Sequence, residues 1–153
     1  MCAVIVRANP ESVAFCEVED FCFKRMFVAY AANINGFKLG FHMMLFADGC
    51  QLHGPYKGTM LAACALDADN HLFNFAYAIV SSEHIEDWVW FLQCVPECLG
   101  NLKPVIISDR GQALLKAVPL VFGKENHAYC LRHLAENFLQ VAAKHGIQKE
   151  ATK

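Results

Sequence analysis

The sequence lacks a surplus of either charge. Its 153 residues include 13 Lys and Arg against 15 Asp and Glu, which gives a formal net charge of −2. A chain without a basic surplus has no global field that attracts nucleic acid. Any contact with nucleic acid must therefore be local or come from other segments.

Long hydrophobic runs, internal repeats and low-complexity tracts are also missing. The apolar run at residues 2–6 is interrupted by Arg7 and has no basic start, so it is too short for a signal peptide or a membrane span. We therefore expect one soluble, intracellular domain with no membrane partner.

Cysteine, in contrast, is plentiful, with eight residues. Three of them, Cys64, Cys94 and Cys130, lie inside apolar periodic segments, and no export signal accompanies them. Free cysteine is among the most buried residue types. We expect reduced and mostly buried thiols rather than a disulfide framework.

Apolar runs with short polar connections predict an antiparallel meander in the first half of the chain. A short strand and a turn at Asn35–Gly36 precede it. The predicted segments are a strand at 23–30, a strand at 39–48 that ends at Asp48, a loop at 49–58, a strand at 59–66, a turn at 67–70 and a strand at 72–80.

The second half alternates helical and strand patterns. Apolar residues at helical spacing predict an amphipathic helix over 81–95, capped by Ser81 or Ser82 and followed by a break from Pro96 to Gly100. A buried strand at 103–109, a helix at 111–118 that stops before Pro119, a strand at 127–130 and a helix at 131–146 follow. The order βββαβαβα predicts an α/β domain with a mixed sheet.

Two aspartates stand at predicted strand ends. If the strand at 103–109 pairs in parallel beside the strand at 39–48, Asp48 and Asp109 lie about one strand spacing apart, ~4.8 Å, which a metal ion can bridge. Residue type alone leaves Asp109 evenly divided between ligand and helix-opening turn, and favours a turn at Asp48.

Several motifs occur in one characteristic order: "DGCQLHGPYKG", the Asp/Asn turn, "WVWFL", "SDR" and "CLRHL". In this combination the chain resembles the catalytic domain of plant Mutator-like (MULE, MuDR-type) transposases, which has an RNase H-like fold. The resemblance covers residues 23–143. It implies a lead-in at 1–22, a partial RNase H-like domain at 23–145, truncated before the C-terminal part of the fold, and a polar tail at 146–153.

The resemblance implies a nuclear, cut-and-paste DNA transposase that acts on terminal inverted repeats, and a homo-oligomer is among the partners it suggests. In that family two Asp and a later Glu bind two divalent cations, Mg²⁺ or Mn²⁺. By motif position, Asp48 matches the first acid and Asp109 the second.

The family's Glu lies well beyond the "CLRHL" helix, so the third acid is expected to be missing from this chain. Glu136 lies too near that helix start, and Glu150 stands in the tail without the family's surrounding motif. The family's N-terminal zinc module and C-terminal zinc knuckle are expected to be missing as well. We therefore expect an inactive fragment of a transposase; the alternative is a transposase-derived, non-catalytic DNA-binding or transcription-regulating protein.

Further residues suit accessory roles. Cys130 and His133 match the family's C-x-x-H element and have zinc-ligand spacing. They supply only two of the four ligands of a structural zinc site, so we favour a buried cysteine and a helix-capping histidine. A joint zinc centre with Cys50 and His53 is the minor alternative. Arg110 and the Asp48 loop, with His53, Tyr56 and Lys57, are candidates for DNA contact, and Lys57 and Arg110 for phosphates.

Two other groups invite a functional interpretation that we do not favour. Asp67, Asp69 and Asn70 are short polar residues typical of a tight strand connection rather than a metal site. Trp88, Trp90 and Phe91 suit helix and core packing better than base stacking, because Trp88 lies on the apolar stripe.

Overall fold

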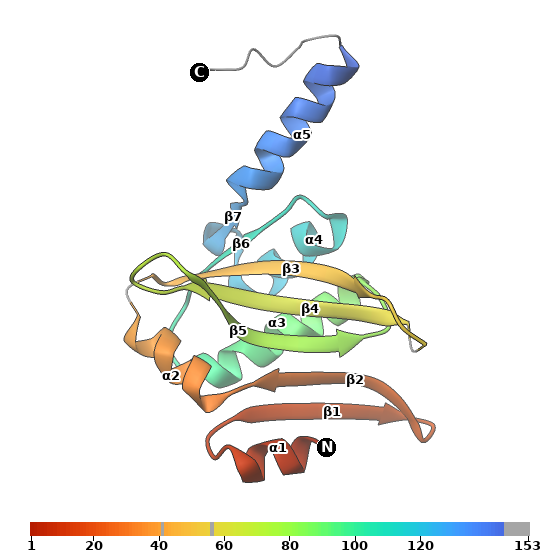
Figure 1. Ribbon diagram of the computed structural model, residues 1–153, viewed down its shortest axis with the longest axis vertical. Coiled ribbons are helices and arrows are strands. Elements are labelled where there is room, and N and C mark those ends of the chain that lie inside the picture. The colour runs from red at the N-terminus through yellow and green to blue at the C-terminus, as the bar shows by residue number, and fades with distance from the viewer. Residues whose placement is uncertain (41, 56, 146–153) are drawn as a thin grey trace.

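The structure, a computed structural model, describes residues 1–40, 42–55 and 57–145 (Figure 1). It is a mixed α/β structure built on a seven-stranded sheet with strand order β1-β2-β5-β4-β3-β6-β7. The strands are β1 (Val13–Glu19), β2 (Cys22–Ala29), β3 (Met44–Leu52), β4 (Gly58–Leu66), β5 (Leu72–Val80), β6 (Val105–Ser108) and β7 (His127–Tyr129). The helices are α1 (Cys2–Ala8), α2 (Ala31–Leu39), α3 (Ile85–Leu99), α4 (Gln112–Phe122) and α5 (Leu131–Lys144).

Strands β3, β4 and β5 form the predicted antiparallel meander, and β6 pairs in parallel beside β3. The predicted mixed α/β sheet is thus confirmed, and its order is compatible with an RNase H-like fold. Along β4 the burial alternates strictly, with Thr59, Leu61, Ala63 and Ala65 buried. One face of the sheet therefore lies in the core.

Helices α3 and α4 pack against each other and against the sheet, behind the meander in the view of Figure 1. The predicted apolar stripe of α3 is confirmed, since Trp88, Leu92 and Val95 are all buried. The rings of Phe27, Phe91 and Trp88 make successive contacts in this core.

Proline did not end either helix, so both predicted stops were wrong. Helix α3 continues through Pro96 to Leu99, and α4 continues through Pro119 to Phe122. Proline costs a helix a hydrogen bond and a clash with the preceding turn. In α3 the burial of Cys98 and Leu99 beyond the proline offsets that cost.

Two local predictions also differ from the structure. Asn35 and Gly36 lie inside α2 instead of forming a turn, because α2 buries Ile34 and Phe37 against the sheet region, where Phe37 contacts Phe75. The residue that precedes α3 as its cap is His84, not Ser81 or Ser82, and it makes no side-chain capping bond.

Strand β3 does not end at Asp48. It runs on to Leu52, because the residues from Gly49 to Leu52 remain paired with β4. The predicted loop is correspondingly shorter. Since β6 ends at Ser108, this outer part of β3 has a strand partner on one side only.

The N-terminal residues add to the same sheet. Strands β1 and β2 form an antiparallel hairpin, and β2 also pairs with β5. The segment described above as a lead-in, residues 1–22, thus contributes β1 to this sheet, and its helix α1 packs against β1. The predicted polar tail, 146–153, lies outside the described residues.

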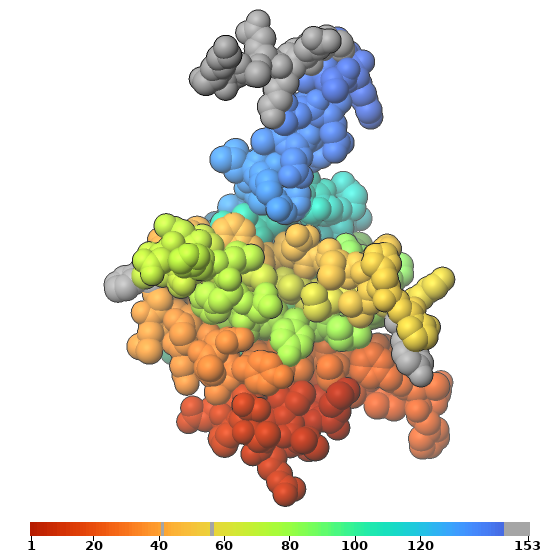
Figure 2. Space-filling model, in the orientation of Figure 1, coloured from red at the N-terminus to blue at the C-terminus, as the bar shows by residue number. Residues whose placement is uncertain are grey.

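Helix α5 stands clear of the rest of the molecule (Figures 1 and 2). Its apolar residues Leu131, Phe138 and Val141 are 79%, 71% and 55% exposed. The sequence predicted this helix, and the structure leaves these apolar side chains largely uncovered.

The eight cysteines have free thiols, as expected, but only Cys94 and Cys98 are buried. The expectation that most thiols are buried was wrong, because several occupy the more exposed strands β1 and β2 and the outer part of β3. No helix among the described residues has both the length and the apolar character needed to cross a membrane.

Candidate active site

The parallel pairing of β3 with β6 brings Asp48 and Asp109 side by side. Its last pair joins Ala47 to Ser108; Asp48 is the next residue within β3, and Asp109 directly follows the end of β6. The pairing that the sequence predicted is therefore confirmed. Asp48 is exposed and Asp109 is half-buried.

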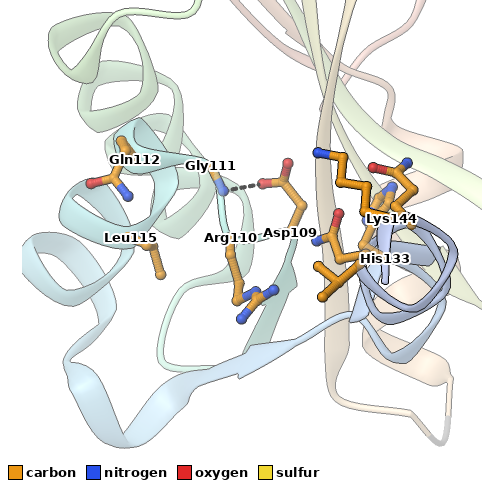
Figure 3. A pocket seen from close by; sticks show the side chains of 10 residues that line it. Asp109, Arg110, Gly111, Gln112, Leu115, His133 and Lys144 are labelled. Carbon is orange, nitrogen blue, oxygen red and sulfur yellow. Dashed lines mark hydrogen bonds between the residues drawn. The ribbon is translucent and has the colours of Figure 1, made fainter. Parts of the chain in front are cut away.

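Asp109 is held in place by the turn that opens α4. The backbone N–H of Gly111 donates a hydrogen bond to Asp109 Oδ1 at 2.8 Å (Figure 3). A β-carbon on Gly111 would lie 2.9 Å from the same oxygen, so glycine permits this close approach. Asp109 thus has the turn role considered for it, while its carboxylate still faces the site.

Ser108 links Asp109 to the neighbouring strand. Its buried hydroxyl donates to the backbone carbonyl of Asp109 at 2.8 Å and lies 2.8 Å from His127 Nε2. A hydroxyl has one proton, so His127 Nε2–H is the donor in the second bond. Burial lowers the pKa of His127, which keeps the ring neutral at pH 7. In addition, Cys130 N–H donates to the Ser108 carbonyl at 2.8 Å and ties the start of α5 to β6.

A cavity of about 360 Å³ adjoins both aspartates. Its lining is largely apolar and also contains Cys64, Cys130 and His133. His133 Nδ1 is buried without a hydrogen-bond partner. Burial, with a smaller contribution from the negative charge of Asp48, raises the pKa of the Cys64 thiol. The two aspartates therefore line the same cavity as His133, an imidazole with one unsatisfied nitrogen.

A third carboxylate, Glu83, lies close enough to feel the charges of both aspartates, and it was not among the residues predicted from the sequence. Glu83 Oε1 is 2.8 Å from the point where a β-carbon on Gly49 would stand. Partial burial raises the pKa of Glu83, and the charges of Asp109 and then Asp48 raise it further. Its position follows from the fold of the β5–α3 link, a contact that local spacing does not encode.

The metal-ligating side chains do not form a closed cage. Within the described residues, no three Cys, His, Asp or Glu side chains are positioned to hold one ion together. This includes both C-x-x-H pairs: Cys130 and His133 line the cavity, whereas Cys50 is exposed on β3. The donors beside the cavity include the carboxylate oxygens of Asp48 and Asp109, which suit Mg²⁺ bound through one or two carboxylates and several waters.

Comparison with protein families gives this arrangement a context. A family model described as the MULE transposase domain matches residues 44–137, more than half of the chain. The chain belongs to the MULE transposase family. No curated protein and no solved structure matches it. The match includes Asp48, Glu83, Asp109 and the Cys130–His133 pair, and membership implies interaction with DNA in general.

The two residues predicted to contact phosphates, Arg110 and Lys57, line two separate hollows of the MULE domain. Arg110 and Lys144 line a cavity of about 700 Å³ between α4 and α5, with Asp109 and His133 also on its wall (Figure 3). Lys57 lines another hollow, of about 500 Å³, at the end of β3 and β4. Both Lys57 and Arg110 are exposed, so both are accessible to a DNA backbone.

The remaining candidates of the MULE domain lie elsewhere or outside the description. His53 lines the same hollow as Lys57. Glu136 lies on α5, where its Oε1 is 3.9 Å from Arg132 Nε. Tyr56 and Glu150 lie outside the described residues.

Two groups have the structural roles that we favoured. Asp67 Oδ1 accepts hydrogen bonds from the backbone N–H groups of Asp69 and His71, and Asn70 has a φ of 63°, so this segment is a turn. Trp88 is buried, and Trp90 packs under Arg25, whose guanidinium carbon is 4.4 Å from the ring centroid.

Proposed function

We propose that this domain is the cation-binding catalytic part of a Mutator-like DNA transposase of the plant MuDR type. The single observation that supports it best is the parallel β3–β6 pairing, which sets Asp48 beside Asp109 within the segment that matches the family. In this proposal both aspartates hold Mg²⁺ or Mn²⁺.

The residues of the site fit such a cation. The donors are hard carboxylate oxygens, and the buried His133 Nδ1 beside them has no partner within the described residues. When bound, a pair of divalent cations activates an oxygen nucleophile and stabilises the leaving 3′ oxygen of a phosphodiester. The chain's own contribution is to fix Asp109 through Gly111 and Ser108 and to provide negative charge where the cations bind.

DNA is the partner in this proposal, specifically transposon terminal inverted repeats in the nucleus. Arg110 and Lys57 bind backbone phosphates on either side of the aspartates. Assembly on two transposon ends calls for a homo-oligomer. We assign no zinc to Cys130 and His133, because a structural zinc site takes four ligands and the pair supplies two. For the 153 residues by themselves we expect little or no transposition.

Fluorescence anisotropy with a labelled DNA duplex tests the proposal. If cations join the aspartates to phosphates, Mn²⁺ increases the DNA affinity of the wild-type protein over that in EDTA, and Asp109→Asn loses this increase. A non-catalytic regulator of the same ancestry binds DNA equally well in EDTA and in Asp109→Asn. That second result, or no DNA binding under either condition, contradicts the proposal.

A further inference from the structure

The link between β5 and α3 emerges at the end of the sheet that carries the aspartates. Strands β3 and β5 are both antiparallel to β4, so they run in the same direction. Beyond the end of β5 at Val80, the chain passes through Glu83 before α3 begins at Ile85. The fold thus brings an acid from the far side of β4 toward the site on β3.

The lack of a side chain at Gly49 allows the Glu83 carboxylate to lie against the backbone next to Asp48. A β-carbon there would lie 2.8 Å from Glu83 Oε1 and 2.9 Å from Glu83 Cδ, closer than real contacts allow. The described glycines with positive φ are Gly100 and Gly123, so the backbone at Gly49 is one that any residue can adopt. A side chain at position 49 would therefore displace the Glu83 carboxylate, the end of a flexible side chain, from its place beside Gly49.

The charge of this acid is not balanced by a basic side chain. Within the described residues no Lys, Arg or His forms an ion pair with Glu83, although Arg25, Lys24 and Arg132 do so with other acids. Acids gathered without a basic partner repel one another. A bound cation removes that repulsion.

We propose that Glu83 is a third carboxylate of the cation site at Asp48 and Asp109, and this inference rests on the function proposed above. The three carboxylates do not converge as direct ligands of one ion. Mg²⁺ takes one or two carboxylates directly and retains several waters, so Glu83 acts by accepting a hydrogen bond from a cation-bound water. It is therefore a positioning residue for the hydrated cation.

Isothermal titration calorimetry with MnCl₂ on the 153-residue protein, without DNA, tests this assignment. Glu83→Gln removes the charge at constant size, and Gly49→Ala keeps every carboxylate but displaces Glu83. Outer-sphere partners commonly contribute about 10–100-fold to metal affinity, so each variant should weaken Mn²⁺ binding by at least about tenfold. Gly54→Ala is the matched control, because a β-carbon there meets nothing within 4 Å. It should bind Mn²⁺ as the wild type does.

Asp109→Asn separates the two proposals, and circular dichroism verifies that each variant is folded. Loss of binding in Asp109→Asn with wild-type affinity in Glu83→Gln overturns the role of Glu83 and leaves the proposed function standing. A wild-type protein that binds no Mn²⁺ overturns both. Weakened binding in Glu83→Gln and Gly49→Ala, with Gly54→Ala unchanged, supports the assignment.

Discussion

At the residue scale, Ser108 joins β6, β7 and the backbone of Asp109 through two hydrogen bonds made by one buried hydroxyl. Ser108→Ala leaves the His127 Nε2–H and the Asp109 carbonyl without these partners. Such a loss typically costs about 1–3 kcal/mol, so we predict a decrease of that size in the free energy of unfolding in urea. Ser82→Ala is the control. Because Ser82 does not cap α3, a change within about 0.5 kcal/mol is expected, and an equal loss in both variants would contradict the account.

Glu83 gives the site a pH dependence of known sign. Its pKa is raised by partial burial and by Asp109 and Asp48, so the charged form is disfavoured in the folded protein. The resulting destabilisation is absent below the ordinary pKa of 4.5 and complete above the raised value. In metal-free buffer, Glu83→Gln should therefore raise the unfolding midpoint temperature at pH 7 and leave it unchanged near pH 3. A lower midpoint at pH 7 would show that the carboxylate is stabilising.

The site could be predicted from the sequence only in part, and these residues show why. Asp48 and Asp109 follow apolar strand patterns and stand in family motifs, so local signals identify them. Glu83 sits in a polar link with no such pattern, and only the tertiary fold brings it over Gly49. Its one sequence-level sign is a glycine beside Asp48, which a hairpin turn explains equally well.

At the element scale, helices α3 and α5 have similar apolar periodicity and different surroundings. Phe91 on α3 is fully buried, whereas Phe138 on α5 is 71% exposed. We predict that Phe91→Ala costs about 3–5 kcal/mol of unfolding free energy. Phe138→Ala should cost no more than about 0.5 kcal/mol. Urea denaturation measures both, and comparable losses would mean that α5 is packed in solution.

The same contrast explains which elements could be predicted. Hydrophobic periodicity correctly predicted the meander, the apolar stripe of α3 and helix α5. In each case the spacing of apolar residues follows from the geometry of that one helix or strand. It could not show what covers α5. The helix stops at Pro96 and Pro119 were both wrong. In α3, the burial of Cys98 and Leu99 outweighs the local cost of the proline.

At the scale of the whole molecule, a net charge of −2 limits non-specific attraction to DNA. We therefore predict weak, salt-dependent binding that depends on a few local cations. In an anisotropy titration at several salt concentrations, Arg110→Ala and Lys57→Ala should each reduce the log–log salt slope by up to about 0.9. Lys103→Ala should leave the salt slope unchanged. Lys103 lies before the start of β6, whereas Asp109 follows the other end of that strand. An equal effect of all three substitutions would place the DNA elsewhere.

The central claim, a divalent cation at Asp48 and Asp109, is tested most directly by locating the ion in the folded protein. Mn²⁺ broadens NMR signals of nearby nuclei, and ¹H–¹⁵N spectra during a titration report each backbone amide separately. The account predicts early, selective broadening at Gly49 and Gly111, whose amides contact the two aspartates, and loss of this broadening in Asp109→Asn. Broadening centred on the Asp67 turn, or no selective broadening, would contradict it.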